Sequence, residues 1–166
     1  MYFILENIYD TYNIGGLFRL ADALAIEKMY ICGESEIPPN SKIKKASIGT
    51  YKVVPWEYKK TAREAIEELK SGAKTSAVKS SSFQKAETAE VKIIAVEQAK
   101  NSIPYTKADY LMPIALILGN ETYGVTEETL KLADQIVEIP MWGINRSLNV
   151  IVSAAIVSYW AAKYFL

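Results

Sequence analysis

Short apolar runs rich in β-branched residues alternate with helical patterns along this chain of 166 residues, and this alternation constrains the fold more than any other feature. The helical patterns cover residues 14–25, 61–70 and 126–133. Such alternation predicts an α/β fold with a mostly parallel sheet flanked by helices. Near-continuous apolar runs favour this fold, because a half-exposed antiparallel strand alternates in polarity. The predicted strands are residues 3–5, 29–32, 52–54, 93–96, 114–118 and 136–139.

Composition limits the chemistry and the cellular setting. The length suits one domain over residues 1–166, with a core that needs no metal or disulfide. Basic and acidic residues both total 19, so a nucleic-acid site has to be a local patch. Histidine is absent, which excludes Ser-His-Asp and Cys-His nucleophiles and the commonest zinc ligand. The single Cys32 and an N-terminus without secretory-signal features predict a cytoplasmic protein.

Two segments leave alternatives open. Residues 71–90 have weak periodicity and are not assigned, although residues 75–78 fit either a strand or a loop. The apolar residues 148–166 fit a membrane anchor or a buried helix. Polar side chains interrupt this last segment, and Asn149 and Trp160 share one of its helical faces. We therefore expect no membrane span but a helix packed against protein, including another subunit.

The first of three polar clusters covers residues 7–22. Here Asn13 is predicted to cap a helix that carries Gly15 and Arg19. Backbone N–H groups at such a positive helix end suit a phosphate or another anion. The alternative is a plain turn and cap. Arg19 interrupts an apolar stretch, so its guanidinium is expected to need a partner.

The second cluster, LGNETYG at residues 118–124, directly follows a predicted strand, where ligands bind in open parallel sheets. Its glycines permit tight turns, while Asn120 and Glu121 offer an amide and a carboxylate. The alternative is a solvated connection between a strand and a helix. The chain contains neither a G-x-G-x-x-G nor a P-loop motif, so the usual dinucleotide and nucleotidase sites have no support.

The third cluster, IPMWGINRSLNV at residues 139–150, also follows a predicted strand. Its backbone suits hydrogen bonding to an adenine edge, with Met141 and Leu148 as apolar walls. Ser147 is predicted to cap or nearly cap the final helix. Ser147 and Asn149 could equally be no more than helix-entry residues.

Taken together and in this order, the three clusters resemble the motifs of the SpoU (TrmH-like) RNA 2′-O-ribose methyltransferases, a branch of the SPOUT superfamily. Asn13, Gly15 and Arg19 fit an N-x-G-x-x-x-R element. Residues 118–124 fit LGNE-x-x-G, and residues 139–150 fit IPM-x-G-x-x-x-SLNV. The third element matches at many fixed positions without a gap, which makes it the most specific.

This resemblance implies a fold with a C-terminal trefoil knot, S-adenosylmethionine as cofactor without a metal, and tRNA or rRNA as substrate. It also implies a homodimer whose subunits share active sites. The implied cofactor-binding residues are Leu118, Gly119, Ile139, Met141 and Leu148. The implied catalytic and RNA-binding residues are Asn13, Arg19, Glu121, Ser147 and Asn149. A non-catalytic knotted RNA-binding or assembly factor is the alternative, against which the retention of these residues argues.

The role of Arg19 is open to two interpretations. The family's proposal makes it the activator of the 2′-hydroxyl, yet a guanidinium stays protonated. Our hypothesis is that Arg19 holds the neighbouring phosphate and stabilises developing alkoxide charge. The chain departs from many relatives at Arg146, where an acidic residue is common, and at Ile151, where a small one is.

The densest basic stretch supplies candidate contacts to an RNA backbone. Relatives grip RNA with sizeable N- or C-terminal extensions, which this chain is expected to lack, so recognition is expected from the knotted domain itself or from a partner. A solvated loop is the alternative. The candidates are Lys42, Lys44, Lys45 and Lys52, with Tyr51 nearby.

Overall fold

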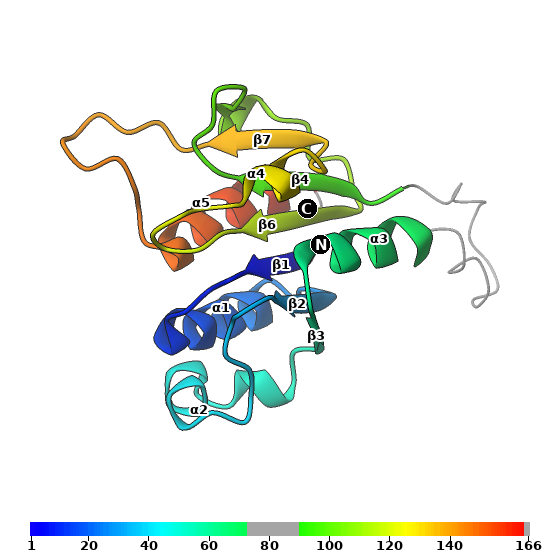
Figure 1. The fold of residues 1–166 in the computed structure, drawn as a ribbon, viewed down its shortest axis with the longest axis vertical. Coiled ribbons are helices and arrows are strands. Elements are labelled where there is room, and N and C mark those ends of the chain that lie inside the picture. The colour runs from blue at the N-terminus through cyan, green and yellow to red at the C-terminus, as the bar shows by residue number, and fades with distance from the viewer. Residues whose placement is uncertain (73–89, 165–166) are drawn as a thin grey trace.

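A seven-stranded, entirely parallel sheet forms the centre of the molecule (Figure 1). The computed structural model describes residues 1–72 and 90–164. The strand order is β3-β2-β1-β6-β4-β7-β5. The strands are β1 (Tyr2–Glu6), β2 (Lys28–Cys32), β3 (Trp56–Lys59), β4 (Lys92–Val96), β5 (Ile103–Pro104), β6 (Ile114–Leu118) and β7 (Gln135–Glu138). The predicted α/β class with a parallel sheet is confirmed.

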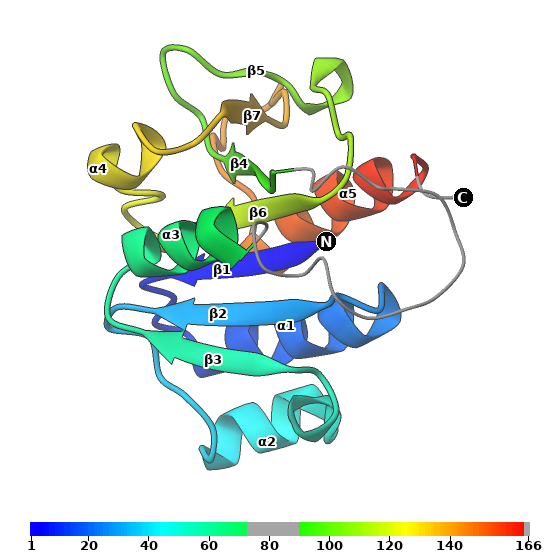
Figure 2. The same ribbon diagram turned by 90° about the vertical axis from the view of Figure 1, so that its right-hand side faces the viewer.

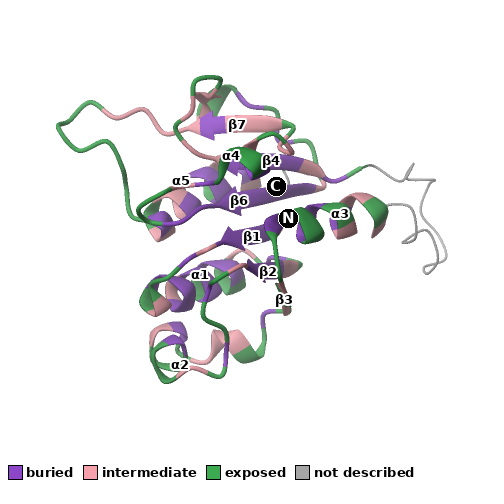
Figure 3. Cartoon of the chain, in the orientation of Figure 1, coloured by how far each residue is buried: buried purple, intermediate pink, exposed green. Residues whose placement is uncertain are grey.

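Helices cover both faces of the sheet, as Figure 2 shows, with α3 on one side and α1 and α5 on the other. Each face of the sheet carries a hydrophobic core, and alternating residues of β1 point into one or the other. Phe3 and Leu5 pack with α1, α2 and α5, whereas Ile4 packs with α3. Burial is concentrated on the central strands and the helix faces against them (Figure 3). The helices are α1 (Thr11–Ala23), α2 (Ser41–Ser47), α3 (Ala62–Gly72), α4 (Glu127–Leu130) and α5 (Val150–Ala162).

Five of the six predicted strands are confirmed, and the strand predicted at residues 52–54 is wrong. A short 3-10 helix, η1 (Thr50–Lys52), occupies that place, and the Val53 and Val54 backbone N–H groups both donate to the Thr50 carbonyl. These hydrogen bonds use the donors that a sheet would need, and Val53 is 69% exposed. The strand begins only after Pro55, at Trp56.

Strand β5 and helix α2 are also absent from the sequence-based predictions. The two-residue strand β5 forms one edge of the sheet. Helix α2 begins at the Asn40 cap, whose side chain accepts from the Lys42 N–H, and so the basic stretch starts in a helix and not in a loop. Helix α2 approaches α1 very closely at Gly15. A Cβ on this residue would collide with Ala46, so only glycine permits this approach. Residues 75–78 lie outside the described residues.

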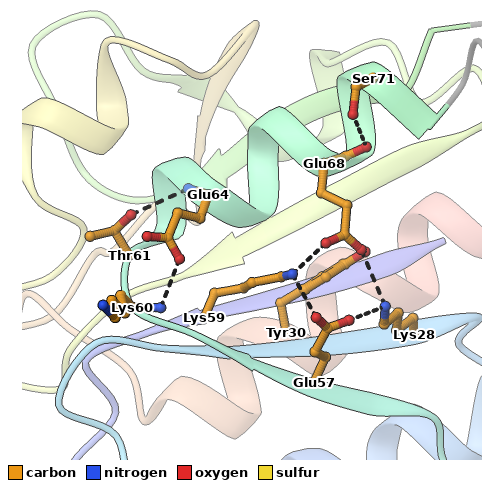
Figure 4. Close-up of polar contacts among 9 residues, drawn as sticks. All are labelled: Lys28, Tyr30, Glu57, Lys59, Lys60, Thr61, Glu64, Glu68 and Ser71. Carbon is orange, nitrogen blue, oxygen red and sulfur yellow. Dashed lines mark hydrogen bonds and ion pairs between the residues drawn. The ribbon is translucent and has the colours of Figure 1, made fainter.

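A network of charged and polar side chains joins α3 to β2 and β3 (Figure 4). The Glu68 carboxylate accepts from the Tyr30 hydroxyl at 2.8 Å and pairs with Lys28 and Lys59. Glu57 pairs with the same two lysines. Partial burial raises the pKa of Glu68, but hydrogen bonds from both lysines and from the tyrosine outweigh it and lower that pKa to about 2. The network therefore stabilises the packing of α3 on the sheet while the Glu68 carboxylate is ionised.

The final helix, α5, is 13 residues long and packs against α1 and the sheet. Within residues 1–72 and 90–164, no helix combines the length and apolar character that crossing a bilayer requires. The prediction of a helix packed against protein is therefore met within this chain.

Candidate functional site

The loops that carry the three sequence clusters meet at the carboxyl ends of the strands. The segment after β6 and the segment after β7 line one cleft with a volume of about 360 Å³. The segment between β1 and α1 contacts the first of these loops through Glu121. Figure 1 shows the loop after β7 extending away from the sheet before the chain returns to α5. This is the place where open parallel sheets bind ligands.

All five residues predicted to bind a cofactor line this cleft. Leu118 is buried at the end of β6, whereas Leu148 is partly exposed at the entrance to α5. The polar side of the cleft carries the carboxylates of Glu97, Glu121 and Glu138. The predicted lining residues are Leu118, Gly119, Ile139, Met141 and Leu148. The sequence clusters thus locate the cleft.

A tight turn shapes the loop after β6. Asn120 and Gly124 exchange both backbone hydrogen bonds, and the Asn120 side chain also accepts from two backbone N–H groups within the turn. Its amide donates to the Asn7 carbonyl at 2.7 Å. A Cβ on Gly119 would collide with the Gly124 and Val125 backbone. Only glycine at position 119 therefore leaves this turn undisturbed.

Glu121 is held at the beginning of α1 by uncharged donors. Its carboxylate accepts from the Asn13 side-chain amide at 2.8 Å and from the backbone N–H groups of Tyr9 and Asp10, each at 3.3 Å. A carboxylate is favoured at a helix N-terminus, where the helix dipole is positive. No ion pair to Glu121 occurs among the described residues.

A hydrogen-bonded chain then joins Glu121 to the start of α5. The Asn149 amide donates to the Asn13 side-chain oxygen at 3.0 Å, so Asn13 links Glu121 and Asn149. Three segments far apart in sequence are thereby fixed relative to one another.

The structure corrects both predicted helix caps. Asp10, not Asn13, caps α1, because its side chain accepts from the Tyr12 N–H and leaves Asn13 inside the first turn. Asn149, not Ser147, caps α5 through the Ile151 N–H. Ser147 is exposed and lines the cleft. Freed from capping α1, the Asn13 side chain is available for Glu121 and Asn149.

Arg19 stands apart from the other predicted catalytic residues. It lies on the exposed face of α1, about two helical turns beyond the site, and does not line the cleft. Across the described part of the chain it has no hydrogen-bond or ion-pair partner. The expectation that its guanidinium needs a partner is therefore not met within one chain.

Comparison with known proteins identifies the family. Residues 1–159 match the model of the SpoU rRNA Methylase family. The chain belongs to this family. The SpoU resemblance based on the three clusters is confirmed.

Several SpoU relatives and structures resemble the chain over nearly its full length. The tRNA (guanosine(18)-2′-O)-methyltransferase of Escherichia coli K12 is 26% identical over 162 residues, which cover 96% of this chain and 61% of the relative. That of Thermus thermophilus is 28% identical over 160 residues, covering 96% and 73%. The chain thus spans about three fifths of the E. coli relative. The SpoU methyltransferase AviRb from Streptomyces viridochromogenes, crystallised with AdoMet, has the same fold, with a TM-score of 0.85, 21% identity and coverage of 99% and 57%.

Two carboxylates that the sequence analysis missed hold the loop after β6 of this SpoU protein. Glu6, at the end of β1, is 6% exposed and accepts from the Thr126 N–H at 2.9 Å and the Thr129 hydroxyl at 2.5 Å. Glu97, after β4, accepts from the Val125 N–H at 2.8 Å. Both lie at carboxyl ends of strands flanking β6, and this position was the available sequence signal.

Proposed function

We propose that this SpoU protein transfers a methyl group from S-adenosylmethionine to a ribose 2′-hydroxyl in tRNA or rRNA. The cleft between the loops after β6 and β7, bordered by the Glu121–Asn13–Asn149 hydrogen bonds, carries the proposal. The names of the E. coli and T. thermophilus relatives support a ribose-directed activity on tRNA.

The residues of the cleft fit this cofactor. Its volume of about 360 Å³ lies within the usual range for small-molecule sites. Apolar side chains of Leu118, Ile139 and Met141 suit an adenine ring, and the carboxylates on the polar side suit the sulfonium and ammonium charges. When bound, S-adenosylmethionine supplies a methyl group that is already strongly electrophilic. The described residues contain no cluster of three or more metal-ligating side chains.

The chain's own residues would mainly align the acceptor and manage charge. Asn13 and Asn149 hold each other and Glu121 in place, which pre-organises polar groups next to the cleft. Ser147, exposed in the cleft lining, offers a hydroxyl to the ribose or the cofactor. Arg19 supplies the positive charge that holds the adjoining phosphate and stabilises the developing alkoxide, while the 2′-hydroxyl proton leaves to that phosphate or to water.

The proposed active protein is a cytoplasmic homodimer, in which Arg19 of one chain serves the cleft of the other. Arg19 cannot serve the cleft of its own chain in the observed arrangement, because it does not line it. The loop after β7 exposes Trp142 at 92% and Ile144 at 100%, and α5 exposes Tyr159 at 56%. Large exposed apolar side chains favour a subunit contact in this region. The proposal includes the C-terminal trefoil knot implied by the resemblance.

The lysines on and after α2 are the proposed contacts to the RNA backbone. None of the four forms an ion pair with a described residue, and close packing of α2 on α1 places this helix beside the one that carries Arg19. Unpaired lysines are free to replace counterions on phosphates. The residues are Lys42, Lys44, Lys45 and Lys52.

Titration calorimetry with S-adenosylmethionine tests the cleft, using two glycine variants that add the same methyl group. Gly119→Ala is expected to abolish binding, because its Cβ collides with backbone. Gly72→Ala, at the end of α3 and away from the cleft, is the matched control, since nothing lies within 4 Å of its added Cβ. Absence of binding to the folded wild-type dimer would contradict the proposal and favour a non-catalytic RNA-binding factor.

Mapping of 2′-O-methyl groups identifies the substrate. We expect at least one site in tRNA or rRNA to disappear from cells without this protein and to return with the wild-type chain. The Arg19→Ala chain should not restore it. An unchanged 2′-O-methylation map would contradict the proposed activity.

A further inference from the structure

Two exposed tyrosines flank Glu121 from different loops. Tyr9 precedes α1 and is 49% exposed, while Tyr123 belongs to the turn after β6, lines the cleft and is 82% exposed. The Tyr9 N–H donates to the Glu121 carboxylate and the Tyr123 N–H donates to the Asn120 side chain, so the backbones of both tyrosines are held close to Glu121. Burial does not explain these aromatic side chains, because each keeps about half or more of its surface in water.

The surroundings of these rings are acidic. The Tyr9 hydroxyl donates to Glu34 at 3.0 Å, and this hydrogen bond raises the pKa of Tyr9, with smaller contributions from Tyr123 and Glu121. Asp10, the cap of α1, follows directly. None of the acids Asp10, Glu34 and Glu121 forms an ion pair with a described lysine or arginine. Phosphates and anionic lipid head groups are therefore repelled here.

The part of a polynucleotide that suits this place is a base. A base is neutral and presents a π-face to aromatic rings, and its donor groups can meet nearby carboxylates. In a helix the bases are stacked on each other, so only an unpaired nucleotide offers this face. The lysines of α2, in contrast, suit phosphates, so the two regions divide the contacts between base and backbone.

We propose that Tyr9 and Tyr123 form a stacking platform for the base of an unpaired nucleotide at or next to the methylated ribose. This inference rests on the proposed function, because RNA is taken as the ligand. It adds that the substrate is single-stranded at the target and that ring stacking, not charge, holds the base. Stacking tolerates different bases, so the platform selects unpaired structure more than sequence.

Binding of a short fluorescent RNA of mixed sequence, alone or annealed to its complement, tests the platform by anisotropy. The wild-type protein should prefer the single strand. The double variant Tyr9→Ala/Tyr123→Ala should bind the single strand about 5- to 100-fold more weakly, as expected for loss of stacking on one base. Its dependence on salt should stay unchanged, since no phosphate contact is lost.

Two control variants test whether the aromatic rings at positions 9 and 123 cause the loss of binding. Tyr9→Phe/Tyr123→Phe should stay within about threefold of wild type, because phenylalanine keeps the stacking face. Tyr164→Ala, which removes a 50% exposed tyrosine after α5, should bind as wild type. The carboxyl end of α5 lies toward the amino ends of the strands, away from the site (Figure 2).

The outcomes separate this inference from the proposed function. If the wild-type protein binds S-adenosylmethionine and methylates RNA but the alanine pair keeps full single-strand affinity, the platform is wrong and the function stands. A monomeric alanine pair would also overturn the platform and assign the rings to the subunit contact. If the wild-type protein binds no S-adenosylmethionine, the proposed function and the platform fall together.

Discussion

Two groups of carboxylates in this protein differ in their partners: Glu57 and Glu68 beneath α3 contact lysines, and Glu121 at the cleft contacts neutral donors. Glu57 and Glu68 share two lysines, so the cluster beneath α3 is balanced within the chain (Figure 4). Glu121 accepts only from amide and backbone N–H groups and has no ion pair among the described residues. The lysines balance the charges of Glu57 and Glu68, whereas Glu121 lines the cleft and has no cation paired with it within residues 1–72 and 90–164, so its charge is left for a ligand. The comparison indicates that the second cluster is the functional one.

Loss of Arg19 should have the largest effect, because in the proposed dimer it supplies the cation that the surroundings of Glu121 lack within one chain. Arg19→Ala is expected to lower kcat for methyl transfer about 100- to 1,000-fold, the usual effect of removing one group that stabilises transition-state charge. Arg19→Lys should restore little, since lysine lacks the planar fork. Single-turnover rates at saturating RNA measure this.

Thermal unfolding provides the control for Arg19. The side chain is exposed and has no partner among the described residues, so both variants should unfold as wild type. Nearly full activity of the lysine variant would remove the proposed role.

Glu121→Gln should lower kcat/KM by about 10- to 100-fold. The change replaces a charged acceptor with a neutral amide, which weakens the hydrogen bonds that two backbone N–H groups and Asn13 donate. A net loss equivalent to about one charge-assisted hydrogen bond, worth about 1.5–3 kcal/mol, gives an effect of this size. Steady-state kinetics measure the loss. The matched variant Glu68→Gln should keep wild-type kinetics. An equal loss of kcat/KM in both variants would contradict the claim that Glu121 serves function and Glu68 serves structure.

Glu6→Gln tests a carboxylate that resembles Glu121 in its neutral donors but is buried. It should lower the free energy of unfolding by about 1–3 kcal/mol, because the Thr126 and Thr129 groups lose a charged acceptor in a buried place. Urea unfolding measures this effect. An unchanged unfolding midpoint would show that this anchor of the loop after β6 contributes no stability.

Glu68→Gln should have the smallest effect on stability, about 0.5–1 kcal/mol, because its side chain is 39% exposed and solvent screens its ion pairs. The pKa of Glu68 is lowered to about 2 in the folded state. Its contribution is therefore present above the unfolded pKa of about 4.3 and is lost as the pH falls toward 2. Urea unfolding measures this: the difference in free energy of unfolding between wild type and Glu68→Gln should become smaller as the pH falls from about 5 to about 3. A difference independent of pH would contradict the ion-pair explanation.

The sequence predicted the sheet and the cleft better than it predicted the helix ends. The run Ile114–Leu118 and the polar loops after β6 and β7 carry local signals, and strand polarity places both loops at one edge. Asp10 and Asn13 are both good caps, so spacing alone does not choose between them. Helix α2 is too short for a clear periodic pattern.

Contacts between distant residues were beyond the sequence. Glu121 and Asn13 are 108 positions apart, and a single sequence has no local pattern that pairs them. The β-branched residues Val53 and Val54 favour a strand, yet Gly49 and Pro55 lie on either side of a helical turn there. Tertiary packing decided the first case, and local hydrogen bonds within the turn decided the second.

Methyl transfer in vitro from labelled S-adenosylmethionine to RNA from cells lacking the protein tests the central claim most directly. A 2′-O-methyl group blocks alkaline cleavage of the adjoining phosphodiester, so the position of the label identifies the acceptor. We predict label in alkali-resistant dinucleotides with the wild-type protein, and labelling that is at least about 100-fold slower with Arg19→Ala. Label on a base, or no transfer by a folded dimer that binds the cofactor, would contradict this prediction.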